Sequence, residues 1–446
     1  MLKDAWALAI ETLSWIELQR LGERLALARA SKQLAIQDPK VVGLAHKLVF
    51  ETQRRLNVID SALAIALAPK SLGEYRLGVQ SFLRLYACRV LFESADLEEA
   101  VAMASMARSI LGWHQLNDVE EALGKLLSLP LTDVYKGAGD EETMALRTFN
   151  PTWFVKYCFK MLGRGQALNF LESAALSTPT FIRVNALKAS EETCLQMLRE
   201  EGVTLEKEPL LKHAYRVVET RKPLMRTQSF REGYFYIQDK ASSFAAEVAD
   251  PKPGDTVLDI CAAPGAKTTY LAQLMQNEGT IYSIDYSRRR IQEWKRETKR
   301  MGVKNSVAII ADAQRQLPIT LAADLVVLDP PCTSTGAFGK TPSAKWRLTK
   351  RSVFTMAEIQ WNMLNNCAGQ VKDGGHLLYS TCSVALEENE MLIERFLRWR
   401  PEFKLVTTTP RLGLPGFRGL SECQRLYPHI HDCNGFFVAK LVKEDA

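Results

Sequence analysis

Apolar residues recur at steps of three and four over roughly the first 140 residues, the spacing that places side chains on one face of a helix. The first such stripe consists of Leu2, Ala5, Trp6, Ala9, Ile10 and Leu13. Similar stripes run through Val41–Leu56, Ile59–Leu67, Tyr75–Leu91 and Leu97–Leu111. The alternation of a half-buried strand is absent here, so we predict an all-α bundle for residues 1–140.

Residues 145–240 mix strand-like and helix-like patterns. Short runs typical of strands occur at Thr180–Val184, Tyr215–Val218 and Tyr234–Ile237, and a helical stripe occupies Ser190–Glu201. Basic residues outnumber acidic ones in this segment. We therefore predict a small α+β module with a basic surface.

Residues 241–446 alternate between apolar runs and helical stripes. The predicted strands are Thr256–Ile260, Thr280–Ile284, Ser306–Ile310, Asp324–Leu328 and His376–Ser380. The predicted helices are Lys267–Gln276, Arg288–Met301, Val353–Gln370 and Glu387–Arg400. This alternation indicates a parallel sheet with helices on both faces, a Rossmann-like α/β fold. Phe436–Leu441 predicts a final edge strand.

Length and composition agree with a multidomain globular protein. The chain has 446 residues, of which 47% are hydrophobic, and a net charge of +6. No apolar run reaches the roughly 18 residues of a membrane span, and the N-terminus lacks the basic start of a secretory signal. The nine cysteines are scattered without a C-x-x-C pair, which argues against a zinc ribbon or a disulfide framework. We expect a monomeric, cytoplasmic protein that has reduced thiols and does not associate with a membrane.

A ligand site is predicted where the parallel strands end. The first strand runs into a turn of small residues that lets the backbone approach a ligand closely. The turn consists of Cys261, Ala262, Ala263, Pro264, Gly265, Ala266 and Lys267. Asp285, Asp312 and Asp329 follow the next three strands, and three acids would repel a polyphosphate. They suit a ligand with ribose hydroxyls, an adenine amine and cationic groups, as in S-adenosylmethionine.

Two cysteines follow neighbouring predicted strands. Cys332 closes the sequence Asp-Pro-Pro-Cys, where methyltransferases acting on amino groups carry an aromatic residue, and Cys382 closes Ser-Thr-Cys. Carbon-5 of cytosine is a poor nucleophile until a thiolate adds to carbon-6. A second group must then help to remove the carbon-5 proton. Two thiols and Asp329 at one sheet edge would meet these needs.

Taken in order, D-x-C-A-A-P-G-x-K-T, D-P-P-C and S-T-C-S make the chain resemble the RNA cytosine-5 methyltransferases of the Sun type. Supporting matches are Arg183-Val-Asn185, Gln238–Ser243, Lys345-Trp346-Arg347 and Gly435-Phe436-Phe437. Ala266 stands where many members have a second glycine. The resemblance covers roughly residues 145–446.

The resemblance implies roles for particular residues. Cys382 would be the nucleophile, Cys332 would promote elimination, and Asp329 would support the adduct. The turn from Cys261 to Lys267, with Asp285, Asp312 and Asp329, would contact S-adenosylmethionine. The module at 145–240 would be RRM-like, with Arg183 and Asn185 contacting RNA. A looser likeness, in helical layout and domain order, suggests a NusB-like RNA-binding domain at 1–140, ahead of the methyltransferase domain at 241–446.

A basic loop between the two cysteines is a second candidate RNA contact. Gly339–Arg351 holds five basic residues, one tryptophan and no acid. Phosphate contacts and base stacking are predicted for Lys340, Lys345, Trp346 and Arg347. The many cations of Arg288–Lys304 are better explained as a solvated helix face. The cluster His429, His431, Asp432 and Cys433 favours a loop contact over a metal site, so no metal is predicted.

The sequence leaves rival functions open. Ribosomal RNA is favoured as the substrate because of the N-terminal region, while tRNA is an alternative since both classes of enzyme share these motifs. A methyltransferase acting on a protein or an amino group would use neither thiol covalently. A non-catalytic RNA-binding factor for ribosome assembly would keep the fold without the chemistry, although no motif residue is lost here.

Overall fold

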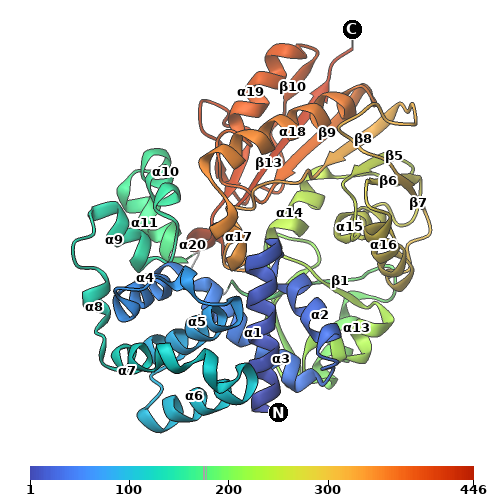
Figure 1. The fold of residues 1–446 in the computed structure, drawn as a ribbon. Coiled ribbons are helices and arrows are strands. Elements are labelled where there is room, and N and C mark those ends of the chain that lie inside the picture. Colours follow the sequence, from blue (N-terminus) through green and yellow to red (C-terminus); the bar gives the residue numbers. More distant parts are fainter. Residues whose placement is uncertain (174–175, 177, 446) are drawn as a thin grey trace. The chain divides into compact units, whose positions relative to one another are not determined.

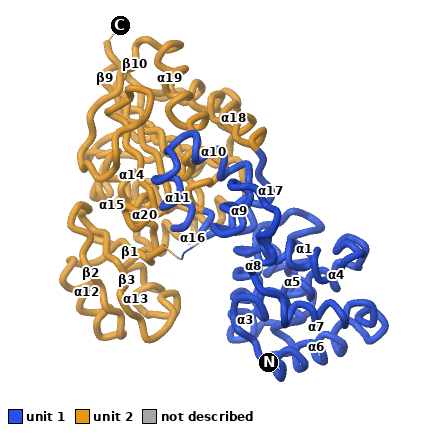
Figure 2. The backbone as a smooth tube through the Cα atoms, turned by 90° about the vertical axis from the view of Figure 1, so that its left-hand side faces the viewer, with its two compact units in different colours: residues 1–176, 338–349 blue, residues 177–337, 350–446 orange. Residues whose placement is uncertain are grey.

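The computed structural model describes residues 1–173, 176 and 178–445. The chain forms two compact units, coloured separately in Figure 2. Unit 1 combines Met1–Leu176 with Phe338–Thr349, and unit 2 combines Ser177–Ala337 with Lys350–Ala446. The chain therefore passes from one unit to the other three times.

Unit 1 is helical, and its core is built from the stripes that the sequence predicts (Figure 1). Trp6, Leu63, Phe82 and Leu83 are among its buried side chains. Asp38 and Asp96 cap α3 and α6 by accepting hydrogen bonds from the first-turn N–H groups of those helices. The helices are α1 Leu2–Gln19, α2 Glu23–Gln33, α3 Pro39–Arg54, α4 Leu56–Leu67, α5 Leu77–Phe92, α6 Leu97–Leu111, α7 Glu120–Ser128, α8 Leu131–Val134, α9 Asp140–Arg147, α10 Thr152–Leu162, α11 Arg164–Ser173 and α17 Pro342–Arg347.

Unit 2 begins with a four-stranded antiparallel sheet in the order β2-β3-β1-β4. Its core includes Ile182, Val184, Leu198 and Phe235. Strand β2 joins the three strands that the sequence predicts here. The elements are β1 Phe181–Val184, α12 Glu191–Glu200, β2 Val203–Lys207, β3 Ala214–Thr220, α13 Gln228–Glu232 and β4 Phe235–Ile237.

The rest of unit 2 is a nine-stranded sheet in the order β11-β12-β13-β9-β8-β5-β6-β7, with β10 paired to β13. Strands β5 to β9 are parallel to one another, and β13 is antiparallel to β9. The elements are α14 Lys240–Ala249, β5 Thr256–Ile260, α15 Ala266–Leu274, β6 Thr280–Asp285, α16 Arg288–Met301, β7 Ser306–Ile310, β8 Ala323–Leu328, α18 Lys350–Ala368, β9 Val371–Thr381, α19 Glu390–Trp399, β10 Phe403–Leu405, β11 Leu414–Pro415, β12 Gln424–Leu426, α20 Pro428–His431 and β13 Phe436–Lys443.

Helices cover both faces of the parallel sheet, as Figure 1 shows. Leu258 and Ile260 of β5 pack with the buried faces of α18 and α19, while Val257 packs with α14 and α15. Alternate residues of one strand therefore serve opposite cores, which explains why Val257–Ile260 is apolar at every position except Asp259. The expected edge position of Phe436–Leu441 is wrong: β13 pairs on both sides, with β9 and with β10 and β12. Among the described residues, we find no helix with the length and apolarity needed to cross a lipid bilayer.

Candidate active site

The turn after β5 has a backbone shape that only glycine adopts readily. Gly265 has a φ of 111°, and a Cβ there would lie 3.3 Å from Cδ1 of Trp294. Helix α15 begins at the next residue, so the turn changes direction within a few residues. The small side chains of the motif thus bring backbone to the edge of the sheet, where a ligand can approach it.

A cavity of about 590 Å³ opens at the carboxyl ends of the parallel strands. This volume lies within the range of pockets that hold small ligands. Acidic, apolar and thiol groups all contribute to its wall. The lining residues are Cys261, Ala263, Pro264, Tyr286, Arg290, Asp312, Gln314, Asp329, Pro330, Pro331, Cys332, Ser334, Met356, Ile359, Met363 and Cys382.

The predicted cofactor residues divide into two groups. Cys261, Ala263, Pro264, Asp312 and Asp329 line the cavity, whereas the others do not. The predicted residues outside the lining are Ala262, Gly265, Ala266, Lys267 and Asp285.

Asp285 is closed off by an arginine that the sequence analysis did not single out. The side chain of Asp285 is fully buried, and its Oδ2 lies 3.0 Å from a guanidinium nitrogen of Arg290. The same carboxylate accepts hydrogen bonds from the backbone N–H groups of Ala263 and Ser287. Arg290 therefore presents a cation to the cavity at the end of β6, where the sequence predicts an acid. A ligand hydroxyl would reach Asp285 only after Arg290 turned away.

The two cysteines from separate strand ends meet in the cavity. Sγ of Cys332 lies 3.2 Å from Sγ of Cys382, and both thiols are free. The hydroxyl of Ser334 lies 3.3 Å from Sγ of Cys382. A hydrogen bond from Cys332 lowers the pKa of the Cys382 thiol, and the same bond, with burial, raises the pKa of Cys332 well above its usual range. The pair is therefore polarised, with the thiolate favoured on Cys382.

Asp329 is held between the turn Cys261–Lys267, which we call the cofactor turn after its predicted role, and the strand that leads to Cys382. Nζ of Lys267 lies 2.6 Å from its Oδ2, and the hydroxyl of Ser380 donates to its Oδ1 at 3.3 Å. Lys267 is buried, while about a third of the Asp329 side chain is exposed. The ion pair leaves Asp329 facing the cavity with its orientation fixed.

Glu388 holds the two cysteine-bearing loops and was missed by the sequence analysis. Its carboxylate accepts the backbone N–H of Thr333 at 2.9 Å, the hydroxyl of Ser383 at 2.6 Å and an amide N–H of Gln360 at 2.8 Å. The hydroxyl of Thr333 also donates to it. Thr333 and Ser383 each follow one of the cysteines. Burial raises the pKa of Glu388, and the only sequence signal was its place six residues after Cys382.

A second buried acid lies under the cofactor turn. The hydroxyl of Thr268 donates to Oδ2 of Asp259 at 2.5 Å and accepts the indole N–H of Trp294 at 2.9 Å. Oδ1 of Asp259 is buried without a hydrogen-bond partner among the described residues. Burial raises the pKa of Asp259 to about 7, so this carboxyl can hold a proton near neutral pH.

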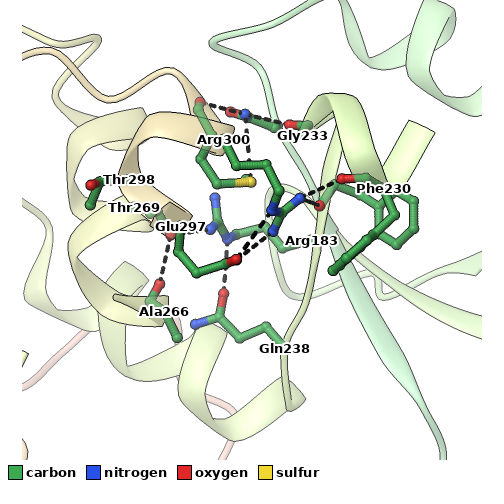
Figure 3. A network of polar contacts seen from close by, with 12 residues as sticks. Arg183, Phe230, Gly233, Gln238, Ala266, Thr269, Glu297, Thr298 and Arg300 are labelled. Carbon is green, nitrogen blue, oxygen red and sulfur yellow. Dashed lines mark hydrogen bonds and ion pairs between the residues drawn. The ribbon is translucent and has the colours of Figure 1, made fainter. Parts of the chain in front are cut away.

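Arg183 and Asn185 are buried supports, which corrects the predicted RNA contact. The guanidinium of Arg183 donates to Gln238 and Thr269, at 2.8 Å each (Figure 3). Asn185 donates to the carbonyls of Gly233 and Met301, also at 2.8 Å each. These bonds fasten the four-stranded module to the elements of the large sheet.

The basic loop between the cysteines also has a different place from the one predicted. Phe338–Thr349 belongs to the helical unit, where the ammonium of Lys345 donates to the carbonyls of Arg54 and Phe149. The side chain of Lys345 is buried, and burial lowers its pKa well below the usual range.

The next two residues after Lys345 also donate hydrogen bonds to backbone carbonyls of the helical unit. The indole N–H of Trp346 donates to the carbonyl of Gln53 at 2.6 Å, and Arg347 donates to the carbonyl of Arg20 at 2.6 Å. Lys345 and Trp346 therefore have their polar groups occupied by the protein itself. Lys340 is exposed, and its predicted RNA contact stays a prediction.

The histidine and cysteine cluster near the C-terminus has local protein contacts. His431 accepts the backbone N–H of Tyr427 at 2.9 Å, and Asp432 lies 3.7 Å from Arg216. Cys433 is buried in the core. Within the described residues, no group of three or more His, Cys, Asp or Glu side chains is arranged to hold a metal ion.

Comparison with protein families gives two matches. A family model described as 16S rRNA methyltransferase RsmB/F matches residues 246–442, which contain both cysteines and the whole cavity. A model for the ferredoxin-like domain of RsmF/B-like methyltransferases matches residues 150–222.

Individual relatives extend the likeness. A probable ribosomal RNA small subunit methyltransferase B of Bacillus subtilis is 30% identical over 307 residues, which are 68% of each chain. A 25S rRNA (cytosine-C(5))-methyltransferase, nop2, of Schizosaccharomyces pombe is 33% identical over 303 residues, or 64% of this chain, and the match spans about half (49%) of that longer relative. The crystal structure of PH0851 superposes with a TM-score of 0.83 and 30% identity, covering 99% of each chain.

Proposed function

Because this chain belongs to the RsmB/F family of RNA methyltransferases, we propose that it methylates carbon-5 of a cytosine in RNA with S-adenosylmethionine as the methyl donor. Ribosomal RNA is the favoured substrate, with tRNA as the alternative. The observation that carries the proposal is the pair of thiols, 3.2 Å apart, on the wall of the same cavity as Asp329. Amino-group methylation has no use for a polarised thiol pair.

The residues around the cavity fit S-adenosylmethionine. Asp312 and Asp329 offer carboxylates for an amine or a cation, and Met356, Ile359 and Met363 give an apolar wall for a flat base. The cofactor would supply an electrophilic methyl group at the thiol end of the cavity. Its remaining contacts would come from the turn at Cys261–Lys267, with Arg290 moving to open Asp285.

The protein side chains account for the remaining chemistry. The Cys382 thiolate forms a bond to carbon-6 of the cytosine, and the displaced electron pair makes carbon-5 nucleophilic. Negative charge develops on the ring nitrogen in this step, and Asp329 would support the adduct by relaying a proton to that nitrogen from the ammonium of Lys267. After carbon-5 has gained its methyl group, a water molecule takes the carbon-5 proton, and Cys332 promotes this elimination. The Cys382–carbon-6 bond then breaks, which restores the aromatic ring and the free thiol.

We further propose that the parts of the chain in front of the catalytic fold select the RNA. The three-domain division at 1–140, 145–240 and 241–446 and the NusB-like character of the first part remain proposals. Their support is the helical unit 1 and the four-stranded module that precedes the large sheet. The target cytosine must be unpaired or flipped out to reach a thiol in a cavity.

A trapping experiment tests the chemistry. Cys332→Ala is incubated with S-adenosylmethionine and unmodified ribosomal RNA and tRNA transcripts, and the protein is run on a denaturing gel. The expected result is a slowly migrating RNA–protein adduct, because elimination is blocked after methyl transfer. Adding Cys382→Ala should abolish the band, whereas Cys194→Ala, which removes a free thiol of the four-stranded module that does not line the cavity, should keep it.

The outcomes separate the rival functions. A band that survives Cys382→Ala would mean that the nucleophile is another residue. Absence of any band on RNA that is bound, together with absence of methyl transfer by the unaltered protein, would favour a non-catalytic RNA-binding factor. Methyl transfer that withstands Cys382→Ala would favour a protein or amino group as the acceptor.

A further inference from the structure

A basic depression lies in unit 2 where the four-stranded module meets α16. Its volume is about 590 Å³, and we refer to it as the joint basin. Side chains from both modules form it. They are Lys188, Arg231, Glu232, Tyr234, Arg296, Lys299 and Arg300.

The floor of the joint basin is held rigidly by Arg300. Its guanidinium donates to the carbonyls of Phe230 and Phe235, at 2.6 and 3.2 Å, and lies 2.7 Å from a carboxylate oxygen of Glu297 (Figure 3). The backbones of the two modules also touch, since a Cβ on Gly233 would lie 2.0 Å from the carbonyl oxygen of Arg300. The backbone segments that carry the cations on either side of the joint are therefore held together.

Four cations of the basin have no charged protein partner. Within the described residues, Lys188, Arg231, Arg296 and Lys299 form no ion pair or side-chain hydrogen bond, and all four are exposed. Arg300 is neutralised by Glu297. Glu232 is the one acid in the lining, and it accepts a hydrogen bond from Gln228. The basin thus holds a local excess of positive charge that the protein does not balance.

The cations converge from two elements. Arg296 and Lys299 are three residues apart on α16 and so project from the same side of that helix. Lys188 reaches the end of the same helix, because its Cε would lie 3.2 Å from a Cβ on Gly302. Helix α16 also carries Glu293 and Glu297, and Glu297 pairs with Arg300. The excess of positive charge arises where cations of the separate module join Arg296 and Lys299.

We propose that the joint basin binds backbone phosphates of the RNA substrate, which anchors the RNA across the module joint. The inference rests on the proposed function, since it assumes that RNA is the substrate. Exposed, unpaired lysine and arginine side chains bind phosphates without reading sequence, and they position the strand. Tyr234, half-buried at the same site, adds a hydroxyl that can donate to a phosphate oxygen.

The test measures how RNA affinity depends on salt concentration. Arg296→Gln with Lys299→Gln removes two of the unpaired cations, and the probe is a fluorescein-labelled, mixed-sequence single-stranded RNA. Each lost phosphate contact lowers the slope of log affinity against log salt by about 0.7, so the expected change is about 1.4. The matched control is Arg288→Gln with Lys295→Gln, which removes two exposed cations of the same helix that do not line the basin. The control should keep the slope of the unaltered protein.

Parallel measurements make a failure interpretable. Methyl transfer to transcribed RNA by the unaltered protein tests the proposed function independently of the basin. If transfer occurs but the slope of the Arg296→Gln, Lys299→Gln variant is unchanged, the basin proposal alone is overturned. It is also overturned if both double variants lower the slope equally, because the effect would then reflect net charge. If the variant keeps its RNA slope but loses binding to polyglutamate, the basin serves an acidic protein and the RNA proposal is overturned.

Discussion

Lys267 and Lys345 are two buried lysines whose surroundings differ in charge. The ammonium of Lys267 lies against the carboxylate of Asp329 on the border of the cavity. That of Lys345 donates to the carbonyl oxygens of Arg54 and Phe149, in the helical unit, and forms no ion pair among the described residues. Both lysines belong to motifs that the sequence analysis assigned to ligand binding, with Lys267 in the cofactor turn and Lys345 in the basic loop.

The difference shows what a basic motif can mean. Lys267 fixes the direction of the Asp329 carboxylate, for which we propose a catalytic role, so its charge acts at the cavity. Lys345 fastens the segment Phe338–Thr349 to α3 and to the backbone beside α9, so its role concerns the fold. The basic loop Gly339–Arg351 therefore attaches this segment to the helical unit through Lys345. A loop of similar composition with exposed, unpaired cations would instead be able to contact RNA. Substitutions at the cavity beside Lys267 should lower activity, whereas substitutions around Lys345 should lower stability.

The largest effect is expected for Cys382→Ser, on the catalytic side of the comparison. A serine hydroxyl is not ionised near neutral pH, so the attack on carbon-6 loses its nucleophile. The rate of methyl transfer should fall by at least about 10⁴-fold, as for other enzymes that lose a nucleophile. Transfer of labelled methyl groups to RNA measures it, with the thermal midpoint as the control for folding. Activity above a tenth of the original would show that Cys382 does not form the bond.

Glu388→Gln should reduce kcat by about 100-fold, the cost of displacing reacting groups by about an ångström. The amide oxygen can still accept the N–H of Thr333, but the amide NH2 group then faces the hydroxyls of Thr333 and Ser383, which now donate to the carboxylate. This exchange disturbs both cysteine loops. The partly exposed neighbour offers a matched control in Glu387→Gln. Titration of the thiols with a reactive reagent gives a second readout, since a role in positioning should alter the pH at which Cys382 reacts. An unchanged thiol profile beside a lower thermal midpoint would mean a purely structural role.

Lys345→Met tests the anchor side through the pH dependence of stability. Burial holds the pKa of Lys345 below its value in the unfolded chain, so the unfolded state binds the proton more tightly and stability rises with pH in the interval between the two. Methionine removes this dependence but leaves two carbonyls without a donor, at about 1–3 kcal/mol each. The unaltered protein should therefore melt above the variant at pH 9.5, by a larger margin than at pH 7. A margin that shrinks as pH rises would contradict the assignment.

Trp346→Phe should have the smallest effect. The ring is kept and one hydrogen bond to the carbonyl of Gln53 is lost, which costs about 1 kcal/mol. That loss corresponds to a fall of about 2–4 °C in the thermal midpoint for a unit of this size. Binding of single-stranded RNA should not change, and fluorescence anisotropy can establish this. Weaker RNA binding at an unchanged thermal midpoint would restore the tryptophan as an RNA contact.

The parallel sheet could be predicted because each of its central strands is buried on both faces. Val257–Ile260 is an unbroken apolar run apart from Asp259, bounded by turn residues, and the strand ends necessarily share one edge. The same reasoning predicted that Cys332 and Cys382 would be close. What sequence reasoning missed depends on partners far along the chain. Lys345 finds its carbonyl partners 291 and 196 positions away, and no local pattern encodes such contacts.

Asp285 and Arg183 show two further limits of sequence reasoning. Asp285 stands at the predicted strand end, but its exposure depends on the conformation of Arg290, a long side chain with several rotamers. Arg183 belongs to a short motif that resembles RNA-binding families, and a buried arginine has the same letter as an exposed one. Its three hydrogen-bond partners, Gln238, Thr269 and Gln273, become visible only when the two modules are placed together.

Because the chain passes between the two units three times, the units cannot be expressed separately by a single cut in the sequence. A cut after residue 176 assigns Phe338–Thr349 to the second polypeptide, while the carbonyls of Gln53, Arg54 and Phe149 remain in the first. The first polypeptide would then lack the segment that donates hydrogen bonds to these carbonyls, and the second would carry that segment. If the two polypeptides reassemble, Phe338–Thr349 of the second should return to its contacts with the first. Expressing unit 2 alone would require a polar linker between residues 337 and 350 in place of Phe338–Thr349.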